Sequence, residues 1–107
     1  MPLVSVIIPH YGGEGILSEC LISLQNTDYS ELDIIVVDNN SPDDSINIVN
    51  KRFSDVNFIH SEYNRGFAGG CNFGVQHAKG EYILILNNDT IHEKDWVTHL
   101  VNRLESN

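Results

Sequence analysis

Two amides and a carboxylate, Asn87, Asn88 and Asp89, directly follow the apolar run of residues 82–86. Hard divalent cations such as Mg²⁺ and Mn²⁺ take oxygen ligands, commonly one or two carboxylates, with phosphate oxygens and water completing the shell. A cation that bridges a diphosphate offsets the negative charge that grows on a leaving nucleotide. Asp89 is therefore a candidate metal ligand, and the alternative is that it serves only as a turn residue.

A second carboxylate, Asp38, follows the four aliphatic residues 34–37 and precedes Asn39. At the edge of a sheet, such a carboxylate can accept hydrogen bonds from a nucleobase or a ribose hydroxyl. It can equally cap the turn that leads into the next helix, which is a common role of aspartate. The sequence pattern alone leaves both interpretations open.

Residues 64–74 contain four of the eight glycines of the chain. Glycine permits positive φ angles and a close approach of the backbone to a ligand, and a following helix N-terminus presents N–H groups to phosphate oxygens. Arg65 adds a positive charge to this loop. The alternative is a tight turn followed by a small-residue helix packed flat on a sheet. The spacing is not the dinucleotide-binding pattern G-x-G-x-x-G, which follows the first strand of such domains.

Four apolar runs have the β-branched and aliphatic character of strands that are covered on both faces. Apolar residues at helical spacing occur between these runs and after the last one. The second helix is predicted to begin with Ser41 as N-cap and Pro42 in its first position. The predicted strands are residues 3–8, 33–37, 56–59 and 82–86, and the predicted helices are 16–24, 41–53, a segment after the glycine cluster that runs to Lys79, and 96–104.

This alternation predicts an α/β fold: a Rossmann-like, mostly parallel sheet with right-handed crossovers and helices on both faces. A length of 107 residues suits one domain, residues 1–107. In such sheets, ligands bind at the carboxyl ends of the strands, near the point where strand order reverses. We therefore expect the polar residues that follow the strands to line one edge of the sheet.

The formal net charge of −9, from 15 acidic and 6 basic side chains, disfavours binding to nucleic acid and to anionic membranes. The sequence shows no signal peptide and no apolar run of the length that spans a bilayer. Its two cysteines lack the spacing of a metal site. These features predict a cytoplasmic protein without a transmembrane segment.

Four motifs, taken in order, resemble those of the family 2 glycosyltransferases, most closely the rhamnosyltransferase-like branch. They are V-S-V-I-I-P-H-Y at residues 4–11, V-V-D-N-N-S-P-D-D-S at 36–45, N-R-G-F-A-G-G-C-N-F-G at 64–74 and L-N-N-D-T at 86–90. The resemblance implies an A-type glycosyltransferase fold whose N-terminal half binds a nucleoside diphosphate sugar with Mg²⁺ or Mn²⁺. It further implies a single displacement with inversion, and a saccharide acceptor in cell-surface polysaccharide synthesis.

The resemblance also implies roles for individual residues. Asp89 matches the last acid of the family's metal motif, and Asn87 stands where many members have the first acid, which lowers the charge of the metal site. Gly12 stands where the family often has asparagine, so no contact is assigned to it. The predicted substrate-binding residues are Pro9, Tyr11, Asp38, Asn39, Arg65, Gly66, Asn87 and Asn88, and the predicted metal ligand is Asp89.

Catalytic domains of this family continue well past the metal motif, so we expect residues 1–107 to be a nucleotide-sugar-binding half without the acceptor side or the general base. No catalytic residue is assigned, and the chain alone is expected not to turn over substrate. The alternative is a non-catalytic module that binds a nucleotide or self-associates through exposed apolar surface. A receiver-like domain, phosphorylated at Asp38 or Asp89, would not explain the glycine-rich loop.

Overall fold

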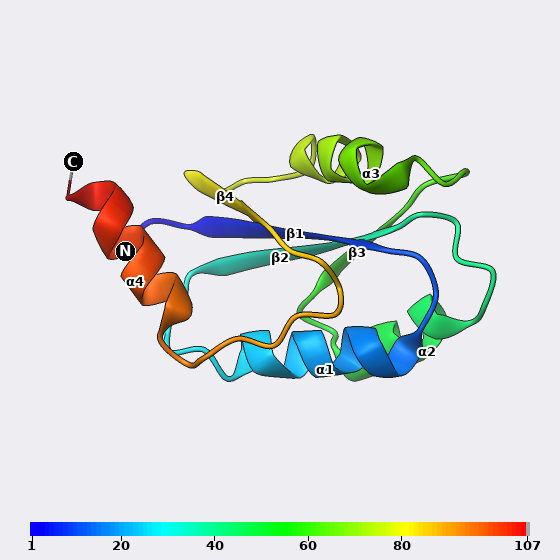
Figure 1. Ribbon diagram of the computed structural model, residues 1–107, viewed down its shortest axis with the longest axis horizontal. Coiled ribbons are helices and arrows are strands. Elements are labelled where there is room, and N and C mark those ends of the chain that lie inside the picture. The colour runs from blue at the N-terminus through cyan, green and yellow to red at the C-terminus, as the bar shows by residue number, and fades with distance from the viewer. Residues whose placement is uncertain (107) are drawn as a thin grey trace.

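The computed structural model describes residues 1–106 and shows four strands that alternate with four helices (Figure 1). Each predicted strand is confirmed, and the first three extend further toward the expected ligand edge than their apolar runs do. In chain order the elements are β1 (Val4–His10), α1 (Glu14–Gln25), β2 (Leu32–Asp38), α2 (Ser45–Arg52), β3 (Asn57–His60), α3 (Gly66–Val75), β4 (Tyr82–Ile85) and α4 (Trp96–Glu105).

The strands form one parallel sheet in the order β3-β2-β1-β4. In the centre of the sheet, Val6 of β1 pairs with Ile34 of β2 on one side and with Leu84 of β4 on the other. The chain passes outward through β2 and β3 and then returns to the opposite side of β1. Strand order therefore reverses between β1 and β4, and the carboxyl ends of all the strands point toward one edge.

Helices cover both faces of the sheet (Figure 1). Successive residues of β1 point to opposite faces, as the two-residue period of a strand requires. Val4, Val6 and Ile8 belong to the larger core, together with residues of α1, α2 and α4, whereas Ile7 belongs to the smaller core under α3. The predicted Rossmann-like arrangement, a parallel sheet between helical layers, is confirmed.

The glycines of α3 allow this helix to pack closely on the sheet. A Cβ atom at Gly74 would lie 2.5 Å from Cγ2 of Ile7 and 2.9 Å from Cγ2 of Val37, and both of these side chains are fully buried. A Cβ atom at Gly70 would lie 2.8 Å from Nδ2 of Asn39. The glycine cluster therefore has the packing role that the sequence left as an alternative, in addition to any role in binding.

The second helix begins later than predicted, at Ser45, because a turn precedes it. The Asp43 carboxylate holds this turn by accepting hydrogen bonds from the Ser45 hydroxyl at 2.6 Å and from the Gly13 N–H at 2.9 Å. The prediction that Ser41 caps the helix is wrong. Its hydroxyl instead accepts a hydrogen bond from the N–H of Gly12, at 3.0 Å.

The third helix ends at Val75, four residues before the predicted end at Lys79. Beyond it, the N–H groups of Lys79 and Gly80 donate to the hydroxyl of Ser5, at 3.2 and 2.8 Å. The chain has to leave the helix to make these bonds, which tie the segment before β4 to the start of β1. Within residues 1–106, no helix combines the length and the apolar character needed to cross a membrane.

Candidate functional site

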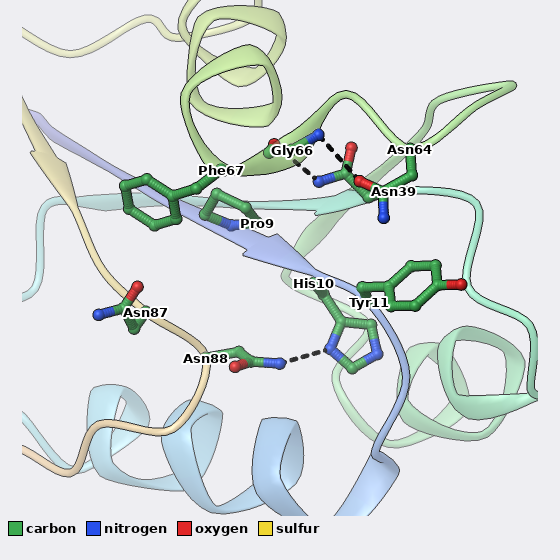
Figure 2. A pocket seen from close by; sticks show the side chains of 9 residues that line it. All are labelled: Pro9, His10, Tyr11, Asn39, Asn64, Gly66, Phe67, Asn87 and Asn88. Atoms are coloured by element: carbon green, nitrogen blue, oxygen red, sulfur yellow. Dashed lines mark hydrogen bonds between the residues drawn. The ribbon is translucent and has the colours of Figure 1, made fainter.

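A cleft lies at the carboxyl ends of β1 and β4, the neighbouring strands between which strand order reverses. Ligands of open parallel sheets bind at such a point. The cleft has a volume of about 290 Å³. Its lining comes from the ends of β1 and β2, the start of α3 and the segment after β4, and consists of Pro9, His10, Tyr11, Asn39, Asn64, Gly66, Phe67, Asn87 and Asn88 (Figure 2).

Most of the predicted site residues meet in this cleft. Those that line it are Pro9, Tyr11, Asn39, Gly66, Asn87 and Asn88. The other three, Asp38, Arg65 and Asp89, are each a sequence neighbour of a lining residue but are not part of the lining. The four motifs thus converge on one edge of the sheet, and the contacts of these residues with a ligand remain predictions.

Asp38 is buried at the end of β2, and both of its carboxylate oxygens have partners within the protein. Oδ1 accepts a hydrogen bond from the N–H of Ser41 at 2.9 Å, and Oδ2 lies 3.2 Å from Nδ1 of His60 on β3. The first of these bonds closes the turn after β2, which is the capping role that the sequence left open. Contact of Asp38 with a base or a ribose stays a prediction.

Asn39 joins three of the segments that surround the cleft. The residue is 4% exposed, its Nδ2 donates to the carbonyl of Gly66 at 3.2 Å, and its Oδ1 accepts a hydrogen bond from the N–H of Arg65 at 3.3 Å. Its own backbone N–H donates to the carbonyl of His10 at 2.9 Å. Asn39 therefore positions the glycine-rich loop against the ends of β1 and β2.

The Arg65 side chain lies outside the cleft. Its guanidinium carbon is 4.2 Å from the ring centre of Phe73 and 4.5 Å from that of Tyr63, and its Nε–H donates to the hydroxyl of Ser61 at 2.8 Å. Cation–π contacts of this kind favour the observed position. To reach a phosphate group in the cleft, the guanidinium would have to leave both rings, so the contact predicted for Arg65 stays a prediction.

The segment after β4 brings Asn87 and Asn88 to the cleft and leaves Asp89 exposed in the following turn. The hydroxyl of Thr90 holds this turn by donating to the carbonyl of Asn87 at 2.9 Å. Residues 1–106 contain no group of three or more His, Cys, Asp or Glu side chains placed to hold a metal ion. A cation at Asp89 would therefore share its shell with ligand and water oxygens, which is the usual coordination of Mg²⁺.

His10 lines the cleft although it was not among the predicted site residues. Nε2 lies 2.8 Å from Oγ of Ser45. Nδ1 lies 3.0 Å from Nδ2 of Asn88, a bond that Figure 2 shows. Burial lowers the pKa of the imidazole, against the opposing influence of the Asp38 and Asp43 carboxylates. The signal in the sequence was its position directly after Pro9, at the end of a central strand.

Phe67 and Asn64 also line the cleft without having been predicted. Phe67 and Tyr11 are each 54% exposed, and their rings lie on opposite sides of the cleft (Figure 2). Exposed aromatic rings offer a face on which a nucleobase can stack. An aromatic residue directly after Gly66, at the start of a helix, was the available signal for Phe67.

The sequence matches the family model for Glycosyl transferase family 2 over residues 5–107. It is 36% identical over 93 residues to a GalNAc(5)-diNAcBac-PP-undecaprenol beta-1,3-glucosyltransferase of Campylobacter jejuni, in a match that covers 83% of this chain and 30% of the relative. It is 40% identical over 92 residues to a Poly(ribitol-phosphate) beta-glucosyltransferase of Bacillus spizizenii, covering 80% of this chain and 14% of the relative. The chain thus spans less than a third of either relative.

The fold is similar to two solved glycosyltransferase structures. The S. aureus TarS 1-349 structure in complex with UDP has a TM-score of 0.87 and 28% identity, covering 97% of this chain and 32% of that one. The mannosyltransferase PcManGT from Pyrobaculum calidifontis, in complex with GDP-Man and Mn²⁺, has a TM-score of 0.89 and 28% identity, covering 96% and 32%. These likenesses confirm the predicted A-type glycosyltransferase fold. With four ordered motifs converging on one sheet edge and a family model that matches nearly every residue, the chain belongs to glycosyltransferase family 2.

Proposed function

We propose that the cleft binds a nucleoside diphosphate sugar, and that the whole protein transfers the sugar with inversion to a saccharide acceptor in cell-surface polysaccharide synthesis. The observation that supports this most strongly is the meeting of four motif segments at the point where strand order reverses. The similar solved structures carry UDP in one case and GDP-Man with Mn²⁺ in the other.

In the proposed complex, the nucleoside lies against the exposed rings of Tyr11 and Phe67, with Asp38 and Asn39 on the side of the base and ribose. The diphosphate lies toward the N-terminus of α3. Backbone N–H groups there carry partial positive charge and suit an anion. The positive φ of 72° at Gly66 directs the chain into this helix, and a Cβ there would be strained.

The net charge of −9 means that a bound diphosphate needs a positive partner. The exposed Asp89 carboxylate fits a hard cation, which prefers oxygen ligands, and Asn87 occupies the first position of the same motif. When bound, Mg²⁺ or Mn²⁺ offsets the charge on the departing nucleoside diphosphate. The same net charge supports the proposal that the protein does not bind nucleic acid, and we propose a cytoplasmic location.

In the proposed displacement, the oxygen of an acceptor hydroxyl bonds to the anomeric carbon while the bond from that carbon to the diphosphate oxygen breaks. The electron pair of the broken bond stays on the nucleoside diphosphate, and the hydroxyl proton passes to a general base. We assign neither this base nor the acceptor side to the 107 residues. By themselves, these residues are expected to bind the nucleotide without transferring a sugar.

Calorimetric titration of the chain with UDP, GDP and dTDP, each with and without Mn²⁺, tests the proposal. We expect at least one of the three to bind with a Kd between roughly 1 μM and 1 mM, the usual range of substrate affinity. Mn²⁺ should tighten that binding because it neutralises charge between the diphosphate and Asp89. The matching nucleoside monophosphate is the control, and it should show a weaker dependence on Mn²⁺. Absence of binding by all three diphosphates would contradict the proposed function.

We propose, as a second candidate, self-association through β4. Ile83 and Ile85 are 41% and 47% exposed on one face of this strand, whereas Tyr82 and Leu84 on the other face pack against the core. Within residues 1–106, β4 pairs only with β1 and so has a free edge. Free strand edges and exposed apolar side chains favour association.

Light scattering over a range of protein concentrations tests this second candidate. The wild-type chain is expected to show a mass that rises with concentration, and the double variant Ile83→Thr, Ile85→Thr should remain monomeric because threonine keeps the strand preference and removes apolar surface. Ile22→Thr, at a 50% exposed position on α1, is the matched control and should behave as wild type. A constant monomer mass for the wild-type chain would exclude association through this strand.

A further inference from the structure

Four side chains from distant segments form a chain of hydrogen bonds at the cleft. Nδ2 of Asn88 lies 3.0 Å from Nδ1 of His10, and Nε2 of His10 lies 2.8 Å from Oγ of Ser45. The same Oγ lies 2.6 Å from Oδ1 of Asp43, whose Oδ2 accepts the N–H of Gly13 at 2.9 Å. These hydrogen bonds link the segment after β4 to the start of α2 and to the loop after β1.

Asp43 sets the direction of every bond in this chain. Hydrogen bonds from the Ser45 hydroxyl and the Gly13 N–H lower the pKa of the Asp43 carboxyl to about 2, so the group is ionised and can only accept. Ser45 has one hydroxyl hydrogen and donates it to Asp43. The Ser45 oxygen must then accept, and the group that faces it is Nε2–H of His10.

The remaining nitrogen of the ring is then an acceptor. His10 is 1% exposed, and burial favours the neutral imidazole, which carries a single N–H. With that hydrogen on Nε2, the lone pair of Nδ1 accepts a hydrogen bond from the NH₂ group of Asn88. The carboxamide oxygen of Asn88 is on the other branch of the amide and is left for a ligand, since Asn88 lines the cleft.

We propose that His10 is a positioning residue of the cleft: as the Nε2–H tautomer, it orients the Asn88 carboxamide so that its oxygen can accept a hydrogen bond from a hydroxyl group of the bound nucleotide sugar. The function of this orientation rests on the proposed binding of that ligand. The hydrogen-bond chain itself belongs to the free protein, so the two can be tested separately.

Two substitutions separate the two hydrogen bonds of the His10 imidazole, one to Asn88 and one to Ser45. In His10→Asn, the side-chain oxygen can occupy the place of Nδ1 and accept from Asn88, whereas the bond to Ser45 is lost. In His10→Gln, the longer side chain can place its NH₂ near Ser45, whereas no acceptor faces Asn88. Affinity is measured by calorimetry with Mn²⁺ and whichever of UDP, GDP and dTDP the wild-type chain binds.

The glutamine variant is expected to bind the nucleotide roughly 5- to 10-fold more weakly than wild type, the effect of about one hydrogen bond, and the asparagine variant within roughly 3-fold. If His10 served only to fill space, asparagine would be the more damaging change because it is the smaller residue. Equal losses, or a greater loss in the asparagine variant, would overturn the proposal.

Nuclear magnetic resonance of the wild-type chain without nucleotide gives a second, independent readout. The long-range ¹H–¹⁵N spectrum should show His10 protonated at Nε2 and bare at Nδ1, with a coupling across the hydrogen bond between Nδ1 and the side-chain nitrogen of Asn88. A ring protonated at Nδ1 would overturn the proposal even if nucleotides bind. If no nucleotide binds, the proposed function fails, and the predicted coupling still decides whether His10 orients Asn88.

Discussion

Replacing Gly80 by alanine is expected to lower the free energy of unfolding by about 3 kcal/mol, the upper range for adding one carbon to a packed site. A Cβ atom at this position would lie 2.5 Å from the backbone nitrogen of Ser5 and 2.8 Å from the carbonyl oxygen of Leu3. Neither is a side-chain atom that can rotate away: Ser5 lies in the central strand β1, and the Leu3 carbonyl accepts the N–H of Glu81 at 2.8 Å. Moving Gly80 outward would also stretch the hydrogen bond from its N–H to the Ser5 hydroxyl.

Urea denaturation followed by circular dichroism measures this loss. Gly15→Ala is the matched control because it is the same substitution in α1, where no heavy atom lies within 4 Å of the added carbon. Alanine is favoured over glycine inside a helix by up to about 1 kcal/mol, so the control should be at least as stable as wild type. Identical midpoints for the Gly80 variant and wild type would show that the loop before β4 can move aside.

The Asp89→Asn variant is expected to lose the effect of Mn²⁺ on nucleoside diphosphate binding. Asn87 is already neutral, so Asp89 is the one carboxylate of the proposed metal motif. Opposite unit charges about 4 Å apart near a protein surface attract by about 4 kcal/mol, so affinity with Mn²⁺ present should fall by at least about tenfold. Affinity without Mn²⁺ should stay close to that of wild type, because the substitution keeps the size of the side chain.

Glu81→Gln is the control for this experiment. It removes the same negative charge at the opposite, amino-terminal end of β4, away from the cleft. If the effect of Mn²⁺ on affinity reflected only net charge, it would change equally in both variants. If Asp89 coordinates the metal, the effect is lost in the Asp89 variant and kept in the Glu81 variant. Calorimetric titration at equal Mn²⁺ concentration distinguishes these outcomes. An undiminished Mn²⁺ effect in the Asp89 variant would show that Asp89 is not a metal ligand.

The position of the cleft could be predicted because ligand sites of parallel sheets follow strand ends. Pro9, Asn39 and Asn87 each lie at or just after the end of an apolar run, and in a parallel sheet these ends share one edge. The order of the four motifs along the chain then identified the family as the family 2 glycosyltransferases. The structure places these three residues around one cleft, as expected.

The orientation of charged side chains could not be predicted in the same way. Asp38 and Arg65 are sequence neighbours of lining residues, yet Asp38 bonds to Ser41 and His60, and the Arg65 guanidinium lies against Phe73. Such partners come from other strands and helices. From the sequence we could predict that a charged residue lies near the site, but not which neighbouring residue its side chain contacts.

By itself, the sequence determined the alternation of strands and helices, the edge of the sheet at which the cleft lies and the family, since these depend on local periodicity and on the order of short motifs. The tertiary structure alone decided the start of α2, the close packing of α3 and the hydrogen bonds of His10. The reason is physical: His10 bonds to Ser45 and Asn88, which are 35 and 78 positions away along the chain, and only the folded sheet brings such residues within reach.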